Sequence, residues 1–281
     1  MACDSSLSRL PEDCVSRILS LTSPRDSCRM LAVSKQFRGP AESNLVWDTF
    51  LPSDYKPRPS NTCPSPSKKE LFFALSDYVL VEAGKKAFRV DKSSGRKCYI
   101  VSARELSILS NGIDNIWSWK SNPESRFCEV AELETSSMLS IEGRIRTQTL
   151  SPSAKYGAYL IIKISNQAYG LDSIPCEISI ATGDRKIASN TAYLRDPADG
   201  KKHILQGLFY GNRGEMLKKR VDQLGDQRVP RKRDDGWMEI EVGEFFNDGG
   251  DEEMVMSLKE IKGHHLMGGL IVEGLEVRPK E

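Results

Sequence analysis

The sequence has few histidines, almost no net charge and no long apolar run. Three His among 281 residues leave little of the side chain that most often acts as a general base or a zinc ligand. The 40 Lys and Arg nearly balance the 39 Asp and Glu, which argues against a global nucleic-acid or membrane-surface binder. No segment approaches the roughly 18 apolar residues of a membrane span. We therefore expect no membrane partner and no direct nucleic-acid partner.

The seven cysteines are odd in number and widely spaced, without a C-x-x-C pair or a Cys/His cluster. Reduced thiols of this kind are typical of the cytosol and the nucleus. The first residues are polar and acidic, where a secretory signal needs an apolar run. We expect a cytoplasmic and/or nuclear protein that binds no metal and needs no cofactor.

Motifs that carry catalysis are also missing: the sequence contains no G-x-G-x-x-G, G-x-x-x-x-G-K-[ST], G-x-S-x-G or H-E-x-x-H. His264 and His265 are adjacent and would point to opposite faces of a strand, and His203 stands alone. The carboxylate pairs Asp234-Asp235 and Glu252-Glu253 are most simply solvated turn residues. We therefore predict no catalytic residue and no enzyme activity, with a hydrolase whose site is assembled across strands as the alternative.

Proline divides the chain. Five prolines between residues 51 and 67 exclude a regular element there, so we predict a helical segment at 1–50, a Pro-rich linker and helix at 51–84, and a larger domain at 85–281. The first segment carries helix start signals at Pro11, at 23–26 (Ser-Pro-Arg-Asp) and at Gly39-Pro40. Three helices this short bury little surface, so part of their apolar surface must dock on a partner or on the rest of the chain.

Beyond the linker, Ser67 and Glu70 form a capping box for a helix that we expect to end at Gly84. A hairpin around residues 93–95 follows, and then Ser102 caps a short helix. Many short runs with a period of two succeed it, separated by turn residues. The clearest places Leu139, Ile141 and Ile145 on one face. The pattern predicts an α+β protein with an antiparallel sandwich or barrel.

Tryptophan supplies the candidate recognition surface. Strand alternation places Trp117 and Trp119 on one face, where two indoles could form a platform for the C–H face of a sugar. The alternative, which we favour on sequence alone, is that one or both belong to the core. Trp237 is either a partly exposed aromatic or a cap over the core at a strand end.

A basic loop at 213–233 precedes an acidic stretch at 234–253. Its two basic clusters resemble a bipartite nuclear-import signal, and the alternative is a solvated loop that pairs with its acidic neighbour. The candidate import residues are Lys218, Lys219, Arg220, Arg231, Lys232 and Arg233.

Residues 5–50 resemble an F-box, with Leu10-Pro11, Ile18-Leu19, Pro24 and Trp47 in register. That resemblance implies binding to the Skp-type adaptor of a Skp–cullin–F-box ubiquitin ligase. Carried over by position, the residues that would form or support the adaptor surface are Leu10, Pro11, Ile18, Leu19, Pro24, Val33 and Trp47.

Residues 85–281 are similar to plant phloem protein 2 (Nictaba-type) lectin domains, through Cys98-Tyr99, residues 104–106, Trp117-Ser118-Trp119, 237–245 and 274–280. This resemblance implies a jelly-roll-like β-sandwich that binds glycans containing N-acetylglucosamine, with Trp117 and Trp119 as contacts. F-box fusions of this domain form a recognised plant class.

Together these predictions describe a non-catalytic receptor subunit of a ubiquitin ligase. Its partners would be the adaptor, through it a cullin–RING ligase, and a target protein or glycoprotein. The alternative is a carbohydrate-binding lectin without a ligase role.

Overall fold

The computed structural model describes residues 10–53, 66–108, 116–171, 175–194, 228–260 and 266–280. The chain divides into two compact units, residues 1–80 with 88–99 and residues 81–87 with 100–281. The first unit thus extends past the Pro-rich stretch to Leu80. All three histidines and the predicted import residues Lys218, Lys219 and Arg220 lie outside the described residues.

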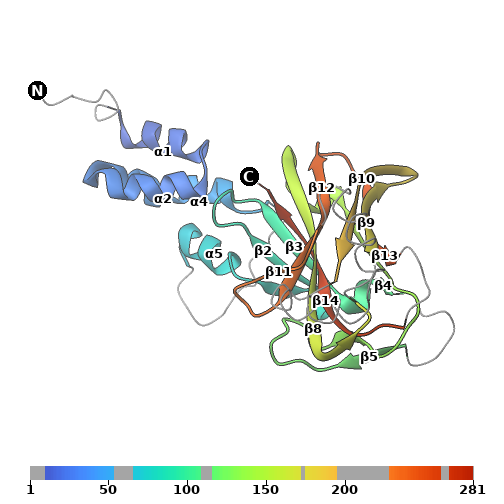
Figure 1. Cartoon of the computed structure of the whole chain (residues 1–281). Helices are drawn as coiled ribbons and strands as arrows, with labels where there is room; N and C mark the ends of the chain where they lie inside the picture. The colour runs from blue at the N-terminus through green and yellow to red at the C-terminus, as the bar shows by residue number, and fades with distance from the viewer. Residues whose placement is uncertain are drawn as a thin grey trace, which may run out of the picture. The chain divides into compact units, whose positions relative to one another are not determined.

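Five short α-helices make up the N-terminal unit (Figure 1): α1 (Glu12–Ser20), α2 (Pro24–Val33), α3 (Arg38–Glu42), α4 (Asn44–Phe50) and α5 (Lys68–Leu75), with a 3-10 turn, η2, at Lys35–Phe37. Two predicted caps form. The Ser23 hydroxyl accepts a hydrogen bond from the Asp26 amide at 3.1 Å. Ser67 and Glu70 form the full capping box, with bonds of 3.2 and 2.8 Å.

Two predicted helices differ from the structure. The helix expected from Gly39-Pro40 is divided into α3 and α4, because Ser43 leaves the helical conformation and its hydroxyl caps Leu45 at 3.3 Å. The helix expected to reach Gly84 ends at Leu75. Its predicted residue Val79 belongs instead to strand β1 (Val79–Val81), an apolar and β-branched run that suits a strand better than a helix.

Trp47 organises the core of the helical unit. Its indole is fully buried and donates to the Ala41 carbonyl at 2.7 Å. The ring centroid lies 5.2 Å from that of Phe72 on α5 and 5.7 Å from that of Phe50. Because a buried indole N–H needs an acceptor, this bond locks α4 against the end of α3.

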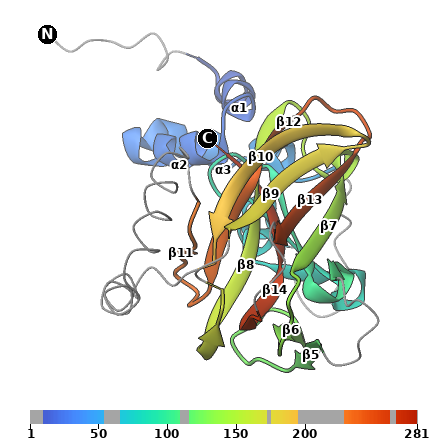
Figure 2. The same cartoon turned by 45° about the vertical axis from the view of Figure 1, so that its right-hand side comes forward.

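The second part of the chain forms two antiparallel sheets (Figure 2). The larger sheet has nine strands in the order β1-β2-β3-β14-β8-β12-β11, with β6 paired to both β14 and β5. Besides β1, its strands are β2 (Lys86–Val90), β3 (Lys97–Ser102), β5 (Trp117–Lys120), β6 (Val130–Leu133), β8 (Ala154–Tyr169), β11 (Arg231–Lys232), β12 (Met238–Asn247) and β14 (Gly268–Pro279).

The smaller sheet has the order β10-β9-β13-β7-β4. Its strands are β4 (Ser107–Ile108), β7 (Ser140–Arg146), β9 (Pro175–Thr182), β10 (Arg185–Tyr193) and β13 (Glu253–Glu260), and 3-10 turns occur at Glu82–Gly84 (η3), Ala103–Glu105 (η4) and Thr147–Thr149 (η5). The predicted alternation of β7 is confirmed, since Leu139, Ile141 and Ile145 are buried. Together with the helices, the two sheets confirm the predicted α+β class.

Glycines allow the two sheets to approach closely. A Cβ placed on Gly243 of β12 would lie 3.0 Å from Ile180 Cδ1 of β9. A Cβ placed on Gly143 of β7 would lie 2.9 Å from Leu106 and 3.2 Å from Leu275 of β14. Side chains at these two positions would push the sheets apart.

Candidate binding sites

Helix α1 has one face packed and one face open. Val15 and Leu19 are buried against the other helices. Pro11, at the start of the helix, and Ile18 are exposed, as is Leu21 directly after its end. These positions, spaced by seven and three residues, share one side of a helix with 3.6 residues per turn. We call Pro11, Ile18 and Leu21 the α1 stripe.

The residues predicted for the adaptor surface fall into two groups. Pro11, Ile18 and Val33 are exposed and Leu10 is half-buried, so these four can contact a partner. Leu19, Pro24 and Trp47 are buried and can only support the surface from below. Two exposed apolar residues were missed, Leu21 and Leu45. The spacing from Ile18 could have indicated Leu21.

Strand β5 holds the two tryptophans at an edge of the larger sheet. It pairs with β6, where Trp117 lies opposite Leu133 and Trp119 opposite Ala131. Both indoles are half-buried, so the favoured alternative of core residues is wrong. The guanidinium of Arg104 lies 3.8 Å from the centroid of the Trp119 ring and is held by Glu129 through bonds of 2.6 and 3.0 Å. Arg104 therefore covers one face of Trp119, a contact that sequence reasoning missed.

The opposite face of β5 is polar. The Ser118 hydroxyl donates to Glu134 at 2.6 Å, and the Lys120 amine lies 2.8 Å from Glu132 and 3.0 Å from Glu134. The hydrogen bond from Ser118, followed by that from Lys120, lowers the pKa of Glu134. The indoles and these polar groups therefore lie on opposite faces of β5, so a sugar stacked on the rings would take its hydrogen bonds from other groups.

Trp237 is a core residue and not a recognition aromatic. It is almost completely buried, and its indole donates to the Glu124 carbonyl at 2.9 Å. The Lys163 amine lies 4.6 Å from the ring centroid. The interpretation as a cap over the core is confirmed, and the partly exposed interpretation is wrong.

Arg233 corrects two expectations about charge. Its guanidinium donates to Glu239 and Glu276 at 2.6 Å each and to Asp235 at 3.1 Å. Burial acts to lower the pKa of Arg233, but Glu276 and Asp235 outweigh it and raise that pKa. Arg233 is therefore bound within the fold and cannot serve as a free base of an import signal, whereas Arg231 and Lys232 are exposed. Asp235, expected to be solvated, is part of the same network.

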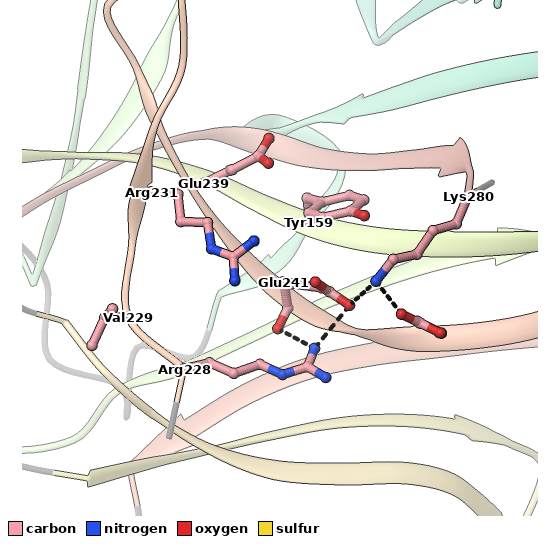
Figure 3. Close-up of a pocket in the computed structure, with 8 residues that line it drawn as sticks. Tyr159, Arg228, Val229, Arg231, Glu239, Glu241 and Lys280 are labelled. Carbon is pink, nitrogen blue, oxygen red and sulfur yellow. Dashed lines mark hydrogen bonds and ion pairs between the residues drawn. The ribbon is translucent and has the colours of Figure 1, made fainter. Parts of the chain in front are cut away.

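A polar pocket of about 210 Å³ opens on the larger sheet (Figure 3). Tyr159 enters from β8, Glu239, Glu241 and Glu244 from β12, and Arg231 from β11, with Arg228, Val229 and Lys280 completing the lining. The Lys280 amine bonds Glu241 at 2.8 Å and also pairs with Glu244. Arg228 lies 3.2 Å from the Glu241 carboxylate. Sequence reasoning missed this pocket, because its residues come from distant segments.

A β-bulge brings the three glutamates together. The register of β12 against β8 shifts between Glu241 and Gly243, so Glu244 lies on the same side as Glu239 and Glu241 although simple alternation would separate them. The amines of Lys155 and Lys280 lower the pKa of Glu244 to about 2. Among the described residues, no group of His, Cys, Asp and Glu could hold a metal ion, and no helix is long and apolar enough to span a membrane.

Comparison with known families accounts for both parts of this architecture. The family model described as "Phloem protein 2" matches residues 96–279. The chain belongs to the phloem protein 2 family. An F-box-like model matches residues 7–52. This family member therefore joins an F-box-like segment to a lectin-like phloem protein 2 domain, as the sequence predicts.

Curated relatives share the whole arrangement. F-box protein VBF of Arabidopsis thaliana is 44% identical over 279 residues, covering 96% of this chain and 99% of the relative. F-box protein PP2-B13 of the same plant is 45% identical, covering 96% and 98%. These relatives are named as F-box proteins and not as enzymes, which agrees with a substrate adaptor that leaves catalysis to others.

Two solved structures are distant neighbours of this phloem protein 2 family member. A family 35 carbohydrate-binding module from Clostridium thermocellum matches with a TM-score of 0.32 and 12% identity, covering 64% of this chain and 96% of the module. The mannan-recognising module TmCBM27 matches with a TM-score of 0.32 and 9% identity, covering 73% and 99%. Likenesses this weak carry no argument about the ligand.

Proposed function

We propose that the chain is the substrate-recognition subunit of a Skp–cullin–F-box ubiquitin ligase. The observation that carries the proposal is the α1 stripe, an apolar surface left open on a helix whose opposite face is buried. It lies inside the F-box-like segment. Exposed apolar residues of this kind on a small helical module are suited to a protein interface.

In this role the chain needs no nucleophile of its own. The helical unit binds the Skp-type adaptor, and through it the cullin–RING ligase, while the β domain holds the target protein. Orientation and proximity alone supply a large effective concentration of the target lysine near the bound ubiquitin-conjugating enzyme.

Adaptor binding tests the proposal through a matched pair of isoleucines. Ile18 on α1 is 45% exposed, and Ile187 on β10 is 41% exposed. We expect Ile18→Ala to weaken binding of the purified adaptor about tenfold or more, as for a hot-spot residue, and Ile187→Ala to leave it unchanged. Calorimetric titration measures both, and thermal unfolding checks the fold. Equal affinities for the two variants would refute the proposed interface.

For the β domain we propose capture of a target that carries N-acetylglucosamine-containing glycans, through Trp117 and Trp119. The half-exposure of both indoles and their common face of β5 support it. The same observations support the second candidate, a plain carbohydrate-binding protein without a ligase role. A glycan array tests the glycan site that both candidates share: the wild-type chain should bind and Trp117→Ala should not. A wild-type chain that binds glycans but no adaptor would favour the second candidate.

We also propose that the protein acts in the cytoplasm and the nucleus, with Lys218, Lys219, Arg220, Arg231 and Lys232 as import residues. The exposure of Arg231 and Lys232 supports this. A fluorescent fusion in which the first three are replaced by Gln should lose nuclear signal, and an unchanged distribution would contradict the proposal.

A further inference from the structure

The ion pairs around the pocket of Figure 3 form two separate groups, which together contain as many bases as acids. The acids and bases joined by these pairs, together with the lining residue Arg231, are Asp235, Glu239, Glu241, Glu244, Glu273, Glu276, Arg126, Lys155, Arg228, Arg231, Arg233, Arg278 and Lys280. That set has six acids and seven bases. Although three glutamates line the pocket, it is therefore not an acidic site.

Arg231 is the one base of this set that belongs to neither group of ion pairs. It lines the pocket, yet its guanidinium makes no hydrogen bond or ion pair with any described residue. Its strand neighbour across the ladder is Glu239, but that carboxylate is already taken by Arg233 at 2.6 Å and by Arg278 at 2.7 and 2.8 Å. Figure 3 shows the Arg231 side chain reaching between Glu239, Tyr159 and Glu241, with no bond drawn to it.

The second unused group is the Tyr159 hydroxyl. The residue is only 7% exposed, and its hydroxyl has no hydrogen-bond partner among the described residues although it lines the pocket. The Arg278 guanidinium lies 3.7 Å from the ring centroid and holds the ring in place. Burial raises the pKa of Tyr159, so the hydroxyl keeps its proton and acts as a donor. The hydroxyl opens into the pocket, where it can donate to an acceptor that a ligand supplies.

We propose that this pocket binds the carboxylate side chain of an Asp or Glu in a protein segment, with Arg231 and Tyr159 as the binding residues. A planar carboxylate can accept two parallel bonds from the Arg231 fork and one from the Tyr159 hydroxyl. The proposal rests on the proposed function, because it names the kind of segment that the receptor captures in a target.

Two observations favour a carboxylate over a basic or a sugar ligand. The unused groups are both donors, whereas the three glutamates that could accept from a lysine or a sugar hydroxyl are each already paired with bases of the fold. The volume of about 210 Å³ lies below the usual range of about 300–1,000 Å³ for pockets that hold larger ligands. A single side chain fits in this volume, whereas an oligosaccharide is too large for it.

The test is a binding measurement on the full chain alone. The probes are a short fluorescein-labelled peptide of alternating Glu and Ser and its counterpart in which every Glu is Gln. We expect fluorescence anisotropy to detect binding of the Glu peptide only. Arg231→Gln should weaken it about tenfold or more, and Tyr159→Phe, which keeps the ring on Arg278, should weaken it about threefold.

Lys232 provides the matched control. It neighbours Arg231 on β11, is also exposed and does not line the pocket, since adjacent strand residues point to opposite faces. Lys232→Gln changes the net charge by the same amount and should leave binding unchanged. Equal weakening by the two variants would reduce the effect to general charge attraction and overturn the proposal.

Two further outcomes would also overturn it: equal binding of the Gln peptide, or binding of an oligogalacturonate but not of the Glu peptide, which would assign the pocket to an acidic sugar. None of these measurements uses the adaptor. A chain that binds the adaptor but not the peptide therefore refutes this inference alone, and a chain that binds the peptide but not the adaptor refutes only the ligase role.

Discussion

We expect the substitution Glu276→Gln to destabilise the β domain strongly, although it replaces a single oxygen atom by nitrogen. The Glu276 carboxylate is completely buried on β14 and accepts bonds from Arg233 at 2.6 Å and from Arg278 at 3.0 Å. Glu276→Gln keeps the size and one carbonyl oxygen but removes the charge. The two guanidiniums must then share Glu239, with a second partner, Asp235, available only to Arg233.

The size of the effect follows from burial. Removing one partner of a buried ion pair costs about 3–5 kcal/mol. Because the Arg233 and Arg278 side chains are 13% and 25% exposed, water can solvate them partly, and we expect the lower end, about 3 kcal/mol. With a urea m-value of about 3 kcal/mol/M, the unfolding midpoint should fall by about 1 M. The fluorescence of Trp237, buried in the same domain, reports the transition.

Arg144→Gln is the control, because Arg144 pairs with Glu142 and Glu253 on the open surface and exposed pairs contribute little. It should leave the midpoint unchanged. A Glu276→Gln midpoint within experimental error of this control would show that the buried network does not stabilise the domain as argued.

Two other groups give predictions that depend on pH. Since the folded protein holds the pKa of Glu244 at about 2, below the ordinary 4.5, its stabilisation is complete above about pH 4.5 and is lost as the pH falls toward about 2. Urea unfolding should therefore find Glu244→Gln about 1 kcal/mol less stable than the parent at neutral pH, with the difference closing over that acid interval; a constant difference would contradict the assignment. Burial raises the pKa of Cys176 to about 12, so iodoacetamide at about pH 8 should modify the exposed Cys14 and Cys128 in the native protein and spare Cys176. Peptide mass mapping measures the modification of each cysteine, and modification of Cys176 as fast as that of Cys14 or Cys128 would contradict its burial.

Local signals predicted the local structure well. Ser23 and Ser67 cap helices as expected, because an N-cap is decided within three residues. The alternation of β7 correctly predicted its buried face, because that strand lies with one side on the core.

Predictions failed where a turn or a contact with a distant segment determines the position of a side chain. Trp237 was placed by the alternation of β12, but it precedes the strand, in a turn where Gly236 has a φ of +80° and Asp235 accepts from the Trp237 amide at 3.1 Å. Strand alternation does not apply there, and the indole enters the core. The stacking of Arg104 on Trp119 and the pocket around Tyr159 depend on contacts between strands, which no local pattern encodes.

The position of β14 in the larger sheet determines when the domain can complete its folding during synthesis. This strand, the last of the described strands in sequence, lies between β3 and β8, which precede it in the chain by about 170 and about 100 residues. Until residue 279 emerges, those two strands have unpaired edges and the domain cannot close, while the helical unit can already be complete. Edges that stay open during synthesis invite wrong pairing, so the nascent β domain should depend on chaperones until its final strand is inserted.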